Sequence, residues 1–221
     1  MIVASPGSNG KETAESIVQR GGQAHWQPTD VTVAAEVEQA VQVALDRYRG
    51  LDAVVHNATS RHSSEVTKLA EIDDTLWDDH MAVSVTGAFH CAMAARNALA
   101  ERRGRLIVMT SPAAMEGSAT LPAYAAMKGA LRGFAKALAI EWGPLGITVA
   151  AGSPLAVTPA LANAYRENPA LEARLEGLVP LGRIGDPEID IAPVIAFLVG
   201  DGARYLSGQT IGVDGGRFTT L

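Results

Sequence analysis

The chain has 221 residues, of which 48% are hydrophobic and 19% charged, with a net charge of -6 and an isoelectric point near 5.4. These values indicate a globular protein with a sizeable core, and the acidic balance argues against nucleic acid or an anionic membrane as a partner. The single cysteine, Cys91, excludes an intramolecular disulfide, and no segment has the pattern of a signal peptide or a membrane span, so we expect a cytoplasmic protein.

The N-terminal stretch MIVASPGSNGKET places Gly7, Gly10 and Lys11 after a short apolar run. A Walker phosphate loop needs glycine where Ser5 stands and a hydroxyl residue where Glu12 stands. The dinucleotide fingerprint G-x-G-x-x-G does not fit the two glycines either. We interpret the stretch as a polar turn that leads into a helix.

Short apolar runs alternate with longer segments of helical periodicity along the rest of the chain. The expected strands cover residues 2–5, 24–30, 51–56, 105–110, 147–152 and 210–215. The expected helices cover residues 12–20, 33–49, 73–103, 122–142 and 189–200, the third with a break near 84–87. This alternation predicts the α/β class, a doubly wound, Rossmann-like parallel sheet, and the absence of repeats and linkers predicts a single domain over residues 1–221.

The least regular segments, 59–72 and 153–188, follow expected strands. Because ligands bind beyond the carboxyl ends of the strands in an open α/β sheet, we expect these segments to form the walls of a pocket. The stretch NAYRENPALEAR (163–174) suggests a mobile, polar lid. The histidines show no metal-ligand spacing and are expected at the surface or at strand ends: His25, His56, His62, His80 and His90.

The sharpest local motif is YAAMK, which places Tyr124 and Lys128 at the start of an expected helix. A separation of four residues puts both side chains on one face, where a lysine ammonium lowers the pKa of a neighbouring phenol. Such a tyrosine can exchange a proton near neutral pH. Ser111 ends the strand RLIVMTS and can hydrogen-bond the carbonyl oxygen that the tyrosine protonates. A solvated helix face for the pair, and a turn or cap role for Ser111, remain alternatives.

With these residues the chain resembles the short-chain dehydrogenase/reductase family from residue 1 to nearly its end. The matching motifs occur in the family's order: Asp30-Val31 for D-V, HNAT (56–59) in part for N-N-A-G, Ser111 thirteen positions before Y-x-x-x-K, GITVAAGSPLAVT (146–158) with Pro154 and Thr158, and the C-terminal third from Val179 onward. The resemblance implies that Tyr124 is the catalytic acid/base. It also implies that Lys128 lowers the pKa of Tyr124 and holds the nicotinamide ribose, while Ser111 orients the substrate.

The resemblance also implies a set of cofactor contacts: Asp30 and Val31 at the adenine, Asn57 and Ala58 at the adenosine ribose, and Val157 and Thr158 at the nicotinamide amide. For Asp30, Asn57 and Thr158, a helix-cap or turn role is an equal alternative.

The chain departs from the family pattern at its beginning. The segment before PTDVT looks like the family's second strand and helix, so the first strand, the T-G-x-x-x-G-x-G loop and the first helix are absent. A central strand is then missing, and three structural outcomes are open: the 2–5 strand occupies its place, a partner chain covers the edge, or the region is poorly ordered with an exposed edge. A shortened gene start is a fourth explanation.

Other departures concern single positions. Ser84 replaces the family's catalytic asparagine, which affects the usual water-mediated proton relay. Leu155 and Thr59 replace glycines, and Leu155 is expected close to the nicotinamide. No acidic residue follows the 2–5 strand to bind a ribose 2′-hydroxyl, which slightly favours NADP over NAD.

The resemblance implies an oxidoreductase that moves hydride between NADP(H) or NAD(H) and a ketone or secondary alcohol, as a homodimer or homotetramer. Two alternatives follow from the missing loop. One is a cofactor-independent, non-redox enzyme that uses Ser111 and Tyr124, and the other is a non-catalytic partner subunit.

Overall fold

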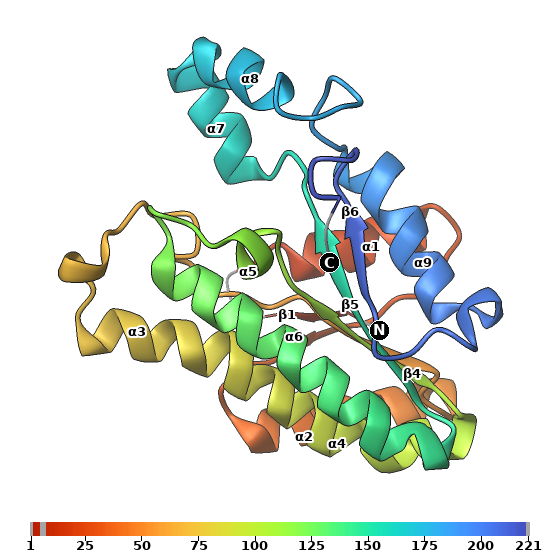
Figure 1. Ribbon diagram of the computed structural model, residues 1–221. Coiled ribbons are helices and arrows are strands. Elements are labelled where there is room, and N and C mark those ends of the chain that lie inside the picture. The colour runs from red at the N-terminus through yellow and green to blue at the C-terminus, as the bar shows by residue number, and fades with distance from the viewer. Residues whose placement is uncertain (1, 5–7, 220–221) are drawn as a thin grey trace.

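The computed structural model describes residues 2–4 and 8–219 of the chain (Figure 1). Its strands are β1 (Ile2–Ala4), β2 (Trp26–Pro28), β3 (Ala53–His56), β4 (Arg105–Met109), β5 (Thr148–Pro154) and β6 (Thr210–Val213). Its α-helices are α1 (Gly10–Gln19), α2 (Ala34–Tyr48), α3 (Asp74–Met81), α4 (Gly87–Arg102), α5 (Ala113–Glu116), α6 (Pro122–Trp142), α7 (Pro159–Glu167), α8 (Pro169–Glu176) and α9 (Ala192–Val199). None of these helices is both long enough and apolar enough to cross a bilayer. Ser5 and Gly7 lie outside the described residues.

Four parallel strands form the main sheet in the order β3–β4–β5–β6, which confirms the predicted α/β class. All five residues of β4 are buried, as expected for a strand covered on both faces. Successive side chains alternate between the two faces. Leu106 and Val108 pack with residues of α4 and α6, whereas Ile107 and Met109 pack with residues of α9.

The predicted break in the third helix is present. A π-helical turn at Ala82–Thr86 separates α3 from α4, and its central residue, Ser84, is completely buried. In contrast, α7 and α8 form where we expected irregular chain. Each of them begins with a proline, a residue that is tolerated in the first turn because it lacks only an N–H group that the helix leaves unpaired. The lid segment is therefore helical in this structure.

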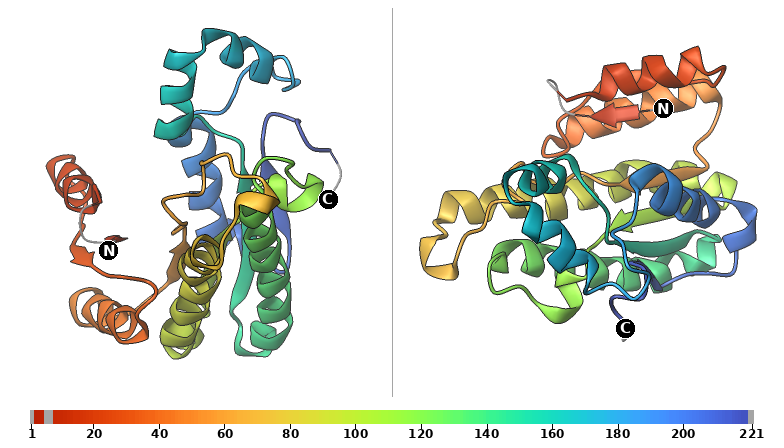
Figure 2. Two further views of the ribbon diagram at one scale, coloured as in Figure 1. Left: turned by 90° about the vertical axis from the view of Figure 1, so that its left-hand side faces the viewer. Right: turned by 90° about the horizontal axis from the view of Figure 1, so that it is seen from above.

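The first two strands form a separate two-stranded parallel sheet. Of the three outcomes left open for this region, the described residues do not show the first, in which the 2–5 strand lies beside β3, because β1 pairs with β2 alone. Figure 2 shows α1, β1, β2 and α2 as a layer at one side of the molecule. Among the described residues β3 is consequently an edge strand, and Val55 in it is 43% exposed.

The N-terminal layer is attached to the rest mainly through contacts between α2 and α4 and through the turn after β2. The ring of His90 in α4 donates a hydrogen bond from Nδ1 to the carbonyl of Val31, at 2.9 Å. Gly87 also approaches this turn closely, since a Cβ built on it would lie 2.8 Å from Cγ2 of Val31. A side chain at position 87 would therefore push the two layers apart.

We predict that Gly87→Val destabilises the protein by about 1–3 kcal/mol, because the added side chain overpacks the contact with Val31. Urea denaturation measures the change in unfolding free energy. Gly133→Ala is the matched control, because a Cβ there meets nothing within 4 Å and should stabilise α6 by about 0.5–1 kcal/mol. Equal stability of Gly87→Val and the wild type would contradict the close approach of the two layers.

Candidate active site

Ser111 and Tyr124 meet beyond the carboxyl end of β4. Ser111 follows β4 after one residue, and Tyr124 lies in the first turn of α6, which begins at Pro122. Burial raises the pKa of Tyr124, and a hydrogen bond with the Ser111 side chain acts in the opposite direction. The phenol is therefore held in its protonated, proton-donating form at neutral pH.

The expectation that Lys128 lowers the pKa of Tyr124 is not met in this structure. The ammonium nitrogen of Lys128 lies 5.6 Å from the centre of the Tyr124 ring and donates a hydrogen bond to the carbonyl of Met109, at 2.8 Å. Burial also lowers the pKa of Lys128 to about 8, so the charge that would stabilise a phenolate is itself disfavoured. The spacing of Tyr124 and Lys128 along the helix predicts that they are neighbours, but burial decides whether the pKa of Tyr124 rises or falls.

A second contact ties α6 to the same strand end. The hydroxyl of Thr110 donates to the carbonyl of Lys128, at 2.7 Å, and both residues are buried. Together with the bond from Lys128 to Met109, this contact fixes the position of α6 along the end of β4. The placement of Tyr124 against Ser111 follows from it.

Two histidines lie deeper than the sequence indicated. His56 closes β3, as predicted for a strand end, but it is buried, and burial lowers its pKa to about 4. Its Nε2 lies 2.9 Å from the carbonyl of Ser84, so Nε2 carries the proton and donates. His80 is buried within α3, so its prediction as a surface or strand-end residue is wrong. The sequence pattern gives no signal for the contact between His56 and Ser84, because the two residues are 28 positions apart.

The predicted cofactor residues fall into two groups. Asn57 and Ala58 follow β3, and Val157 and Thr158 follow β5, so both pairs share the carboxyl edge of the main sheet with Ser111. Asp30 and Val31 follow β2 in the N-terminal layer. The structure therefore does not place the two groups on one continuous sheet.

Several of these residues have structural partners. One carboxylate oxygen of Asp30 accepts hydrogen bonds from the backbone and the hydroxyl of Thr32, at 2.9 and 2.7 Å, as a turn residue does. The hydroxyl of Thr158 accepts from the backbone N–H of Leu161, at 3.2 Å, as a helix cap does. These are the alternatives that the sequence left open for the two positions.

The backbone N–H of Val157 is also engaged, because it donates to the carbonyl of Gly185 at 2.9 Å. At the catalytic end, by contrast, donors remain for a nicotinamide ribose. The ammonium of Lys128 has three N–H groups, of which the bond to Met109 uses one, and the Tyr124 ring centre lies 5.6 Å from it. The residues present thus fit the nicotinamide end of a dinucleotide, whereas no glycine-rich loop within residues 8–219 joins a strand to a helix beside β3.

The chain is similar to several known proteins. The family model described as enoyl-(acyl carrier protein) reductase matches residues 1–217. The chain is 33% identical over 202 residues to a 3-oxoacyl-[acyl-carrier-protein] reductase of Synechocystis, covering 90% of this chain and 78% of that protein. It is 30% identical over 213 residues to the reductase FabG of Staphylococcus aureus, covering 94% and 84%.

Among solved structures, a gluconate 5-dehydrogenase from Burkholderia cenocepacia, in complex with NADP and tartrate, matches with a TM-score of 0.89. The sequence identity is 25%, and the match covers 100% of this chain and 85% of that one. A doubly wound α/β fold with this serine and tyrosine at its strand ends defines a class of nicotinamide-dependent oxidoreductases. The chain belongs to the short-chain dehydrogenase/reductase family.

The depressed pKa of Lys128 predicts a specific pH dependence of stability. The unfolded chain binds a proton up to a pH of about 10.5, but the folded chain binds it only up to about 8. Below about pH 8 the folded state must hold a buried charge, which lowers its stability. The unfolding free energy therefore rises between about pH 8 and 10.5. We predict that the unfolding free energy of the wild type rises relative to that of Lys128→Met by about 2 kcal/mol between about pH 7 and 9.5.

Denaturant unfolding at a series of pH values measures this difference. Lys136→Met is the control, because Lys136 is exposed on the same helix and its removal should leave the pH profile unchanged. Parallel pH profiles for the wild type and Lys128→Met would show that Lys128 does not carry a lowered pKa in solution.

Proposed function

We propose that this chain reduces a ketone to a secondary alcohol with NADP(H) or NAD(H), and that Tyr124 is the proton donor. The observation that carries the proposal is the placement of Tyr124 next to Ser111 at the carboxyl edge of the sheet, with the Lys128 ammonium 5.6 Å from the centre of the Tyr124 ring. A protonated phenol suits the reductive direction, in which the tyrosine gives up a proton to the oxygen of the reduced carbonyl.

The residues of the site have separate roles in this reaction. A bound nicotinamide dinucleotide supplies the hydride. The Ser111 hydroxyl donates a hydrogen bond to the substrate carbonyl oxygen and holds it next to Tyr124. Tyr124 would transfer its phenolic proton to that oxygen as negative charge develops on it. Lys128 and Tyr124 would also hold the nicotinamide ribose.

The proposal includes a slight preference for NADP. Within residues 8–219 no glycine-rich loop joins a strand to a helix beside β3, which is an edge strand among the described residues. The N-terminal ends of helices and glycine loops bind much of a pyrophosphate group, so we expect weak cofactor affinity.

The proposed substrate is a small carbonyl compound, and the names of the relatives make a 3-oxoacyl compound the first to test. We also propose a homodimer or homotetramer, supported by Phe89 and Met93, which leave an apolar strip exposed along α4. A non-catalytic partner subunit is the second candidate function. The observation that favours it is the separation of the Asp30-Val31 turn from the main sheet.

We predict that the protein binds NADPH saturably, because the catalytic end of the site retains its donors. Energy transfer from the three tryptophans, Trp26, Trp77 and Trp142, to bound nicotinamide measures the affinity, first with NADPH and then with NADH. The expected dissociation constant is about 0.1–1 mM, since the pyrophosphate lacks a glycine loop. Absence of binding at millimolar cofactor would exclude the dehydrogenase function for this chain alone.

We predict that Tyr124→Phe lowers the rate of ketone reduction by about 10²–10⁴-fold at saturating NADPH, because the proton donor is lost. NADPH oxidation with ethyl acetoacetate, a 3-oxoester, measures the rate. Tyr205→Phe is the matched control, since the Tyr205 side chain is fully exposed and should not affect turnover. Activity that persists in Tyr124→Phe would disprove the proposed mechanism.

A further inference from the structure

A hydrogen-bonded cluster joins the end of β3 to the π-helical turn between α3 and α4. It consists of His56, the last residue of β3, Ser84 in the turn and Cys91 in α4. His56 and Ser84 are buried, and the proposed reaction gives none of the three side chains a role. The cluster ties a strand of the main sheet to the irregular point between the two helices.

Both ring nitrogens of His56 have partners. Nε2 lies 2.9 Å from the carbonyl oxygen of Ser84 and donates a hydrogen bond to it. Nδ1 lies 3.9 Å from Sγ of Cys91. Burial raises the pKa of the Cys91 thiol to about 11, so the thiol keeps its proton and can donate to Nδ1. His56 is therefore neutral with a fixed tautomer, and the two contacts hold the ring in one orientation.

The bond from His56 reaches the helix inside its π-helical turn, a rare element that occurs mostly as a single-turn bulge and often at functional sites. Within the turn the carbonyl of Ser84 shares the backbone N–H of Gly87 with the carbonyl of Ala82. Because Ser84 is completely buried, bulk water does not reach this carbonyl, and His56 supplies its second donor. A Cβ built on Gly87 would lie 3.3 Å from Cε1 of His56, so the ring fits closely against the start of α4.

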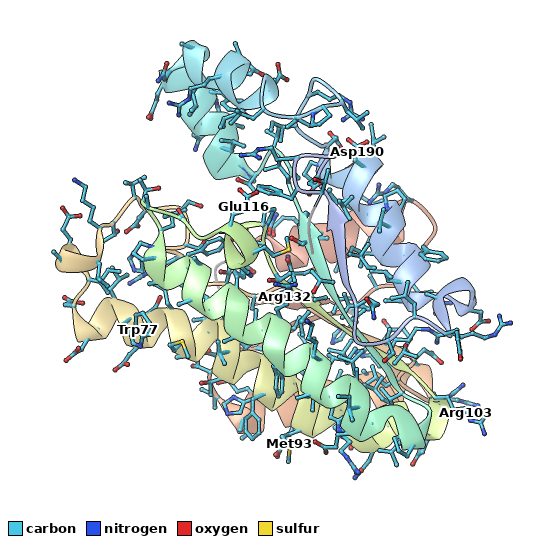
Figure 3. All side chains as sticks on the ribbon, in the orientation of Figure 1. Trp77, Met93, Arg103, Glu116, Arg132 and Asp190 are labelled. Atoms are coloured by element: carbon cyan, nitrogen blue, oxygen red, sulfur yellow. The ribbon has the colours of Figure 1, made fainter. Side chains whose placement is uncertain are left out.

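The turn is in contact with α6, the helix that carries Tyr124 and Lys128. In addition, α3 contacts α6, and residues of α4 and α6 share one hydrophobic core. In Figure 3, Trp77 in α3 and Met93 in α4 lie on either side of the turn, and α6 runs beside both helices. The ammonium of Lys128 is close enough to His56 to contribute to its lowered pKa. A displacement of the turn would therefore reach the functional side chains of α6.

We propose that His56 is a positioning residue for the reductase reaction. Its bond to the carbonyl of Ser84 fixes the π-helical turn, and the turn supports α6 with Tyr124 and Lys128. Without this donor the turn relaxes, and Tyr124 loses its alignment with the substrate oxygen. The kinetic consequence rests on the proposed function, whereas the effect on the surroundings of Lys128 does not.

Substitutions of His56 separate the hydrogen bond from the volume of the ring. His56→Leu removes the donor, and His56→Gln places an amide N–H donor close to where Nε2 lies. The reaction is followed with ethyl acetoacetate at saturating NADPH. We expect kcat to fall about 10–100-fold in His56→Leu and about threefold or less in His56→Gln, because a displacement of about 1 Å can cost ~10²-fold.

Cys91→Ala is the matched control, because it removes the partner of the other ring nitrogen and leaves the bond to Ser84. Its kcat should equal that of the wild type. An equal loss in His56→Leu and His56→Gln, or no loss in either, would overturn the proposal.

The second measurement does not need turnover. The pKa of Lys128, lowered by burial to about 8, is followed by NMR of carbon-labelled lysine, and Lys128→Met identifies its signal. The neutral ring of His56 carries no charge, so its removal moves this pKa only by changing the surroundings. In His56→Leu we expect the pKa to rise toward the ordinary 10.5, as water enters beside the loosened turn. In His56→Gln and Cys91→Ala it should stay at the wild-type value.

The two readouts distinguish this inference from the proposed function. An unchanged pKa of Lys128 in His56→Leu would disprove the positioning role, whether the wild type reduces a ketone or not. A raised pKa in a protein without reductase activity would support the positioning of α6 and contradict only the proposed function.

His56→Asn replaces His56→Leu if the leucine variant does not fold, which circular dichroism and the urea midpoint establish. The asparagine side chain stays polar, but its amide is too short to reach Ser84 from the same backbone position. The same loss of kcat and the same rise in the pKa of Lys128 are expected. Wild-type values of both in a folded His56→Asn would overturn the proposal.

Discussion

The catalytic arrangement depends on the two buried hydrogen bonds that join α6 to the end of β4. Lys128 donates to the carbonyl of Met109, and the carbonyl of Lys128 accepts from Thr110. Each bond satisfies groups that would otherwise be buried without a partner, and losing either would cost about 1–3 kcal/mol. Since α6 carries Tyr124 and the strand leads to Ser111, the same bonds that stabilise the fold also set the geometry of the proton donor.

This arrangement explains why Lys128 has two properties that a surface lysine lacks. Its side chain is buried against the sheet, which disfavours its charge and lowers its pKa, yet its ammonium nitrogen lies only 5.6 Å from the centre of the Tyr124 ring. Burial of the neighbouring phenol raises the pKa of Tyr124, because the charged form of a phenol is the deprotonated one. The two desolvation effects together keep the phenol protonated, which is the state that a reductase needs before each turnover.

The sequence predicted the parts of the fold that depend on local pattern. The run RLIVMT indicated a buried parallel strand, the spacing of Tyr124 and Lys128 indicated one helix face, and the β-branched residues near Ser84 indicated the break between α3 and α4. It could not predict the sign of the Tyr124 pKa shift, the bond from His56 to Ser84, or the pairing of β1 with β2. These depend on burial and on contacts between distant segments, which periodicity does not report.

The two halves of the site follow strands of two different sheets, so they are held in position by different contacts. The half that holds Ser111 and Tyr124 rests on β4, β5 and α6, whose side chains form one continuous core, so it is positioned independently of the N-terminal layer. The Asp30-Val31 turn is held against α4 by His90 and by the close approach of Gly87, without a strand between β1 and β3 among the described residues. Binding energy from the adenine end can assist catalysis only if that turn is fixed relative to Tyr124. The contact between Val31 and α4 is therefore the physical link through which nucleotide binding and proton transfer would be coupled in this chain.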